Sequence, residues 1–121
     1  MSKQKDLFWV SSSMKDLMKF PKDVQDEALH GLGLAMDGTS YHKAKALKGF
    51  GGATVMELVL LDRAGTFRVV YTVKFEKAIY VLHAFQKKSK TGIKTDKKDI
   101  DLIHDRLRLA SEDQKVRGKS K

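Results

Sequence analysis

The residues of this chain that are best suited to chemistry are cations able to hold a phosphate group. Arg68 lies in the middle of a predicted strand, where a rigid sheet can aim the fork of donors of a guanidinium. Lys87, Lys88 and Lys90 follow the end of the next predicted strand. A lysine there can bind phosphate or, with a lowered pKa, act as an acid. The plainer interpretation is a solvated sheet face followed by a solubilising loop.

His83 is the one histidine within the predicted strands, and the ordinary pKa of a histidine suits proton transfer. Strand alternation puts His83 on the same face as Ile79, Val81 and Phe85, so a packed, hydrogen-bonded histidine is the favoured interpretation. The other histidines lack metal-ligand spacing. The absence of cysteine excludes a disulfide framework, a thiolate metal site and a cysteine nucleophile.

These residue types match the needs of RNA cleavage by 2′-hydroxyl attack. That reaction requires a group that accepts the 2′ proton, donors that stabilise the crowded phosphate, and a group that protonates the leaving oxygen. A glycine-rich stretch at residues 49–52 lacks the spacing of a nucleotide-binding loop. We therefore expect a flexible turn at that stretch.

The net charge of +9 is concentrated in the second half of the chain. Residues 61–121 carry 16 Lys or Arg against 8 Asp or Glu, whereas residues 1–60 carry 8 against 7. This asymmetry favours a polyanionic partner such as nucleic acid over a merely soluble basic surface. The length of 121 residues suits one domain, and no apolar run reaches the length of a signal peptide or a membrane span. We expect a soluble cytoplasmic protein that does not contact a membrane.

Hydrophobic spacing predicts the elements that position these residues. An apolar run at 7–10 suggests a strand or a packed arm, and a short helix follows the serines at 11–13 and ends at Phe20-Pro21. A second helix runs from Pro21 to Gly38 and completes a helical hairpin. Three strands at 56–61, 67–73 and 78–86 form an antiparallel meander, and a last helix follows a cap at Thr95. From Ser111 onward the chain is polar and basic, and we expect it to fray or stay disordered.

Several stretches in the right order together resemble the RelE/ParE superfamily of type II toxins, and most of all its phage-associated, HigB-like branch. They are Lys-Ala-Leu-Lys-Gly at 45–49, Glu-Leu at 57–58, Phe-Arg-Val-Val-Tyr at 67–71, Leu-His-Ala-Phe-Gln-Lys-Lys-Ser at 82–89, and the apolar and charged pattern at 99–107. The resemblance spans roughly residues 6–110. Its most specific feature is the Phe-x-Lys-Lys element that follows an Arg-x-x-Tyr strand.

The resemblance implies an α+β fold in which an N-terminal helical hairpin packs on an antiparallel sheet with a C-terminal helix. Residues 1–110 would form this single domain and residues 111–121 a basic, disordered tail. It also implies a ribosome-dependent mRNA endoribonuclease that uses no metal or other cofactor, with a helix-turn-helix antitoxin as its partner. Catalysis would fall to Arg68, Lys87 and Lys88. The candidate RNA contacts are Lys43, Lys45, Lys48, Arg63, Lys90 and Lys94.

The chain departs from this branch at two positions, and the departures keep two other functions open. Relatives usually carry an arginine where this chain has Val59, and a proline where it has Asp96. One alternative is a toxin of the same fold that inhibits DNA gyrase, because fold alone does not decide the target. The other is a catalytically degenerate RNA-binding module. The nuclease hypothesis requires that Arg68 and the Lys87-Lys88 pair share one surface.

Overall fold

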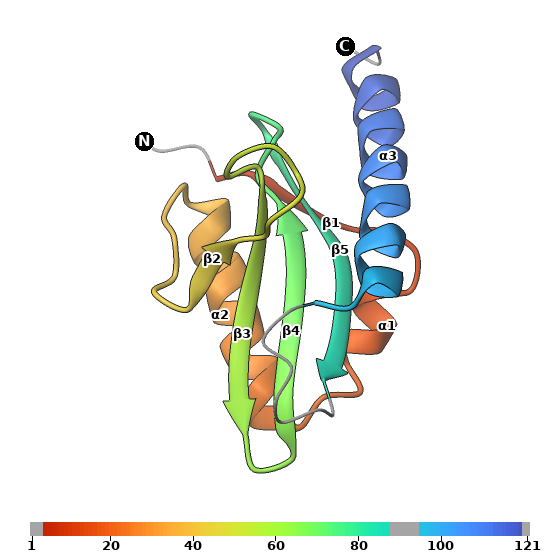
Figure 1. Ribbon diagram of the computed structural model, residues 1–121. Coiled ribbons are helices and arrows are strands. Elements are labelled where there is room, and N and C mark those ends of the chain that lie inside the picture. The colour runs from red at the N-terminus through yellow and green to blue at the C-terminus, as the bar shows by residue number, and fades with distance from the viewer. Residues whose placement is uncertain (1–3, 88–94, 120–121) are drawn as a thin grey trace.

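The structure, a computed structural model, describes residues 4–87 and 95–119 and contains five strands and three helices in that part of the chain (Figure 1). The elements in chain order are β1 (Asp6–Trp9), α1 (Ser13–Leu17), α2 (Lys22–Met36), β2 (Ala44–Ala46), β3 (Val55–Asp62), β4 (Gly65–Thr72), β5 (Ala78–Lys87) and α3 (Lys97–Lys119). The strands form one sheet in the order β1-β5-β4-β3-β2. This confirms the predicted α+β class, in which two N-terminal helices precede an antiparallel meander and a C-terminal helix.

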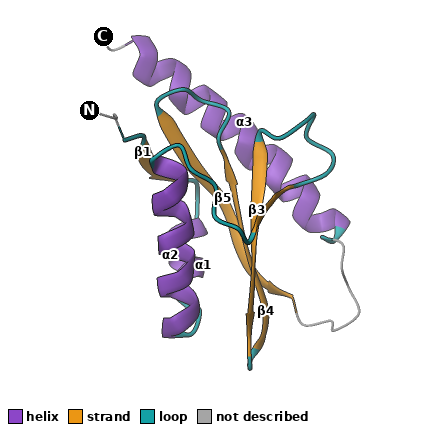
Figure 2. Ribbon diagram, turned by 90° about the vertical axis from the view of Figure 1, so that its left-hand side faces the viewer, coloured by secondary structure: helices purple, strands orange, loops and turns teal. Residues whose placement is uncertain are grey.

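The sheet separates two helical layers (Figure 2), and each layer has its own apolar cluster. Leu17 of α1 and Leu32 of α2 pack with Leu58, Val69 and other residues of one sheet face. Ile103 and Ala110 of α3 pack with Val70, Leu82 and other residues of the opposite face. Strand residues therefore alternate between a hairpin face and an α3 face, and we use these two names below.

The predicted meander is confirmed, because β4 pairs antiparallel with both β3 and β5. The turn between β3 and β4 has Gly65 at a φ of 132°, a conformation that favours glycine. A β-carbon at Gly65 would also lie only 3.0 Å from the Gln86 side chain. Strand β2 was not predicted, because three residues of the sequence Ala-Lys-Ala carry no alternating apolar pattern.

The sheet is not purely antiparallel, since β1 runs parallel to β5. The prediction left residues 7–10 as a strand or a packed arm, and they form an edge strand. Immediately after β1, Ser13 begins α1, and its hydroxyl donates to the backbone oxygen of Val81 over 3.1 Å. This buried contact attaches the first helix directly to the central part of β5.

A β-bulge at Leu82 overturns the predicted face of His83. Val70 pairs with His83 and Tyr71 pairs with Val81, so Leu82 is an extra residue on β5. Ile79 and Val81 consequently lie on the hairpin face, whereas His83 and Phe85 lie on the α3 face. A bulge has no reliable sequence signature, and one extra residue reverses the alternation that follows it.

Helix α3 continues through most of the segment that we predicted to be a disordered tail. It reaches Lys119, and its last turns hold specific contacts with the sheet. The hydroxyl of Tyr80 donates to Asp113 over 2.5 Å, and the guanidinium of Arg117 lies 3.9 Å from the centre of the Phe8 ring. Tertiary contacts therefore stabilise a polar segment whose composition alone favours fraying. No helix in the described part of the chain has the length and apolar character needed to span a membrane.

Candidate functional site

Arg68 is buried on the α3 face, where it forms an ion pair with Glu57. Nη1 of Arg68 lies 2.9 Å from Oε1 of Glu57, and the two side chains are 4% and 1% exposed. The register of β3 and β4 brings this about, because Val59 pairs with Arg68 and Glu57 lies two residues away on the same face. The solvated sheet arginine considered from sequence is thus replaced by a buried, paired one.

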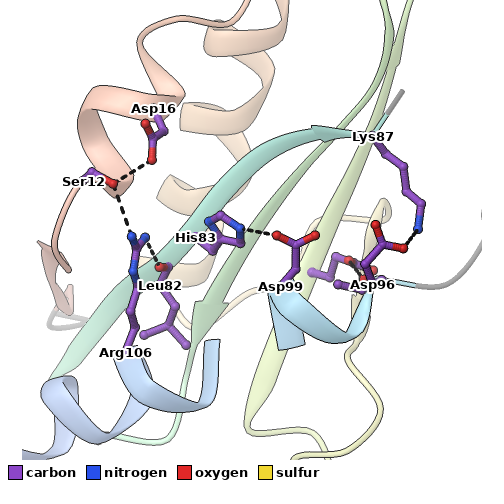
Figure 3. Close-up of polar contacts among 10 residues, drawn as sticks. Ser12, Asp16, Leu82, His83, Lys87, Asp96, Asp99 and Arg106 are labelled. Carbon is purple, nitrogen blue, oxygen red and sulfur yellow. Dashed lines mark hydrogen bonds and ion pairs between the residues drawn. The ribbon is translucent and has the colours of Figure 1, made fainter. Parts of the chain in front are cut away.

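Lys87 ends β5 on the same face as Arg68, beside the start of α3 (Figure 3). Its side chain is 8% exposed, and Nζ lies 3.6 Å from a carboxylate oxygen of Asp96, which is itself 66% exposed. The neighbouring Thr95 donates from its hydroxyl to Glu57 over 2.9 Å. Thr95 therefore does not cap the helix as predicted. The helical hydrogen bonding begins instead where the N–H of Ile100 donates to the oxygen of Asp96.

His83 is buried between β5 and α3, and Nε2 lies 2.9 Å from a carboxylate oxygen of Asp99 (Figure 3). A carboxylate only accepts, so Nε2 carries the proton and Nδ1 of the neutral ring carries a lone pair. Nδ1 is buried and has no hydrogen-bond partner among the described residues. Burial lowers the pKa of His83, and Asp99 partly opposes this shift. The packed, hydrogen-bonded histidine favoured from sequence is thus what the structure contains.

Arg106 of α3 supports the bulge that turns His83 toward this face. Its Nη1 donates to the backbone oxygen of Leu82 over 2.9 Å, and Nη2 donates to the hydroxyl of Ser12 over 3.3 Å. The same hydroxyl donates to Asp16 over 2.8 Å (Figure 3). Because the oxygen of the bulged residue is satisfied by a charged donor, α3, α1 and β5 are fixed together beside His83.

The other predicted cations are spread over several parts of the surface. Lys45 lies at the edge of the site, with Nζ 4.0 Å from Glu57. Lys43 forms an ion pair with Glu27 of α2, Lys48 is exposed in the loop after β2, and Arg63 is exposed at the β3–β4 turn. Lys88, Lys90 and Lys94 lie outside the described residues.

The carboxylates that pair with the predicted cations and with His83 were not predicted from the sequence. Glu57, Asp96 and Asp99 each pair with one of the predicted functional side chains. A signal for Glu57 was present, because it is a lone charge in the apolar strand sequence Val-Met-Glu-Leu-Val-Leu. Asp96 and Asp99 carried no comparable signal, because acidic residues at the start of a helix are common for reasons of local stability.

The arrangement places three groups with complementary chemistry on one face of two adjacent strands. Arg68 pairs across the sheet with Phe85, and His83 and Lys87 lie two residues to either side of Phe85. The group offers a guanidinium, an ammonium and an imidazole whose tautomer is fixed by a carboxylate. These are the parts needed to hold a phosphodiester and move a proton beside it. Within the described residues, no three His, Asp or Glu side chains gather to hold a metal ion.

Two solved structures are similar to this chain. A double mutant of the Escherichia coli toxin RelE in the free state matches with a TM-score of 0.58 at 15% identity, covering 88% of this chain and 97% of that chain. The toxin–antitoxin complex RelBE2 from Mycobacterium tuberculosis matches with a TM-score of 0.48 at 13% identity, covering 74% of this chain and 98% of that chain. The first of these likenesses shows that the fold is that of RelE.

Within this class, the sequence matches a family model over residues 15–108. The chain belongs to the family of phage-derived Gp49-like proteins (DUF891). The family and the fold confirm the resemblance to the RelE/ParE superfamily and its phage-associated members. No curated protein matches the sequence significantly.

Proposed function

We propose that this protein is the toxin of a type II toxin–antitoxin system and that it cleaves messenger RNA on the ribosome. The observation that carries the proposal is that Arg68, His83 and Lys87 lie on the same α3 face of the neighbouring strands β4 and β5. Arg68 and Lys87 were singled out from sequence for phosphate chemistry, and His83 for proton transfer. The RelE-like fold agrees with such a role but does not by itself assign it.

The proposed reaction is attack of a ribose 2′-oxygen on the adjacent phosphorus. The unprotonated ring nitrogen of His83 accepts the 2′ proton, because burial lowers the pKa of His83 and keeps the ring neutral. Arg68 and Lys87 stabilise the negative charge that develops on the phosphate. The bond between phosphorus and the 5′-oxygen breaks, and Lys87 supplies the proton to the leaving oxygen. The products are a 2′,3′-cyclic phosphate and a 5′-hydroxyl end.

The remaining predicted residues extend this proposal along the RNA. Lys45 is the natural next contact, because it already reaches the edge of the site at Glu57. Lys88, Lys90 and Lys94 follow Lys87 in sequence and stay predictions, as do Lys43, Lys48 and Arg63. The helix-turn-helix antitoxin, the ribosome as partner and the cytoplasmic location are also parts of the proposal. The division into a toxin domain at 1–110 and a tail stays a prediction too, although α3 already crosses that boundary.

The test maps mRNA ends after the purified protein is added to translating ribosomes. We expect new 5′-hydroxyl ends within codons that occupy the ribosome, and no cleavage of the same RNA without ribosomes. Intact mRNA together with cleaved DNA–gyrase complexes would replace the proposal with the gyrase alternative. Salt-sensitive RNA binding without new ends would indicate a degenerate RNA-binding module.

A further inference from the structure

The three side chains on which the proposed reaction depends are each already bound to a carboxylate. Arg68 is paired with Glu57, Lys87 with Asp96, and His83 with Asp99. Asp96 and Asp99 come from one short stretch at the start of α3, and the neighbouring Thr95 bonds to Glu57. The first turn of α3 thus lies over the part of the sheet where a phosphodiester would have to bind.

The contact between Asp96 and Lys87 is weaker than an ordinary structural ion pair. Lys87 is a buried ammonium whose partner Asp96 is two-thirds exposed and 3.6 Å away. An exposed partner at that distance contributes little, because water screens the pair. Nδ1 of His83 is buried without a hydrogen-bond partner among the described residues. A buried polar atom without a partner is costly unless it serves another purpose.

The rest of α3 is anchored independently of its first turn. Ile103 and Ala110 are fully buried against the sheet, and Asp113 accepts a hydrogen bond from Tyr80. Arg106 holds the bulge of β5 from the middle of the helix. The remaining turns can therefore stay in place if the first turn leaves the sheet, which costs the partial packing of Ile100 and the contact of Asp99 with His83.

We propose that Asp96 and Asp99 occupy the positions of substrate phosphates, so that RNA and the first turn of α3 compete for Lys87 and His83. In the free protein the start of α3 then covers the RNA-binding residues, and binding of a phosphodiester chain requires this turn to move away from the sheet. This inference rests on the proposed function, because it concerns the same site. It adds that the chain carries its own internal competitor for RNA.

The test measures binding of a short single-stranded RNA that is 2′-O-methylated throughout and cannot be cut by 2′-hydroxyl attack. The variant D96N/D99N removes both competing charges with little change in shape. The control variant D101N/D105N makes the same change in net charge on exposed residues of the same helix. Thermal unfolding of all proteins checks that each one folds.

We expect D96N/D99N to bind the RNA roughly tenfold more tightly than the control variant, because two charged contacts of the masked state are lost. In the wild-type protein, saturating RNA should accelerate hydrogen exchange in the first turn of α3 and leave the turns around Ala110 unchanged. Equal affinity of the two variants, or unchanged exchange in the first turn, would overturn the inference.

The outcomes for the two proposals are separable. Wild-type protein that cuts no mRNA on ribosomes, together with tighter probe binding by D96N/D99N, would remove the nuclease proposal and leave a masked RNA-binding site. Cleavage of mRNA together with equal RNA binding by the two variants would support the nuclease proposal. It would also reject the inference that the first turn of α3 competes with RNA. Absence of probe binding by every variant would contradict the inference directly.

Discussion

At the residue scale, the candidate site depends on a buried ion pair between Arg68 and Glu57. Burying two charges costs several kcal/mol of desolvation for each, and their mutual attraction offsets this cost only when the geometry is good. Here the 2.9 Å contact is supplemented by the hydroxyl of Thr95 and by Lys45 at 4.0 Å. An apolar pair would fill the same space at lower cost. Stability alone therefore gives no reason for a charged pair at this position.

The buried pair of Arg68 and Glu57 predicts how single and double variants change the free energy of unfolding. Arg68→Met alone leaves the Glu57 carboxylate buried without its guanidinium and should lower the free energy of unfolding by about 3–5 kcal/mol. Glu57→Leu alone should have a similar effect. The double variant should lose much less than the sum of the two, which urea denaturation of all four proteins can measure. Strictly additive losses would mean that the two side chains do not act as a pair.

At the element scale, the sequence predicted the parts of the fold that local patterns encode. The three central strands follow from alternating apolar residues and from the turn at 62–65, and the helical hairpin follows from spacing and Pro21. The parallel pairing of β1 with β5 could not be predicted, because it joins residues that are distant in sequence. The last turns of α3 were missed for the same reason, since Asp113 and Arg117 are held by Tyr80 and Phe8.

The candidate site was predicted by residue type but not by environment. Arg68 and Lys87 were chosen as cations able to hold a phosphate, and the structure buries both side chains beside carboxylates that were not predicted as partners. The position of His83 depends on the bulge at Leu82, and alternation alone placed it on the wrong face. Pairing partners that come from another element are set by tertiary packing, which a single sequence does not reveal.

The contact of α3 with His83 predicts a pH dependence. Burial holds the pKa of His83 below its ordinary value, although Asp99 and Asp16 favour the charged ring and Arg106 disfavours it. The pKa of His83 is lower in the folded state than in the unfolded state. Burial of the neutral ring therefore makes its full contribution to the free energy of unfolding above the ordinary histidine pKa. This contribution is lost as the pH falls through the interval between the unfolded and folded values.

Urea denaturation at pH 7.5 and pH 5.5 measures this effect. The wild-type protein should lose more stability on acidification than His83→Gln does, because the variant has no ring to protonate. His104→Gln serves as the control, since His104 is exposed and stacks on Phe50. An equal loss of stability in wild type and His83→Gln would show that the charge of His83 is not linked to folding.

At the scale of the whole molecule, the two faces of the sheet differ in the kind of side chains that they carry. The hairpin face is covered by α1 and α2 and carries a continuous apolar cluster. The α3 face combines an apolar cluster under the middle of α3 with the polar group around Arg68, His83 and Lys87. The uneven charge of the two halves of the chain agrees with this division, because all three of these residues come from the basic second half. The central claim is that RNA is cut on the α3 face.

The most direct test compares two lysine-to-methionine variants in the ribosome cleavage assay. Lys87→Met removes a buried ammonium from the α3 face, whereas Lys22→Met removes an exposed one from α2 on the other side of the sheet. The account predicts that Lys87→Met lowers the rate of mRNA cleavage by about 10²–10³-fold without loss of folding, and that Lys22→Met cuts at the wild-type rate. Cleavage by Lys87→Met at the wild-type rate, or equal loss in both variants, would contradict it.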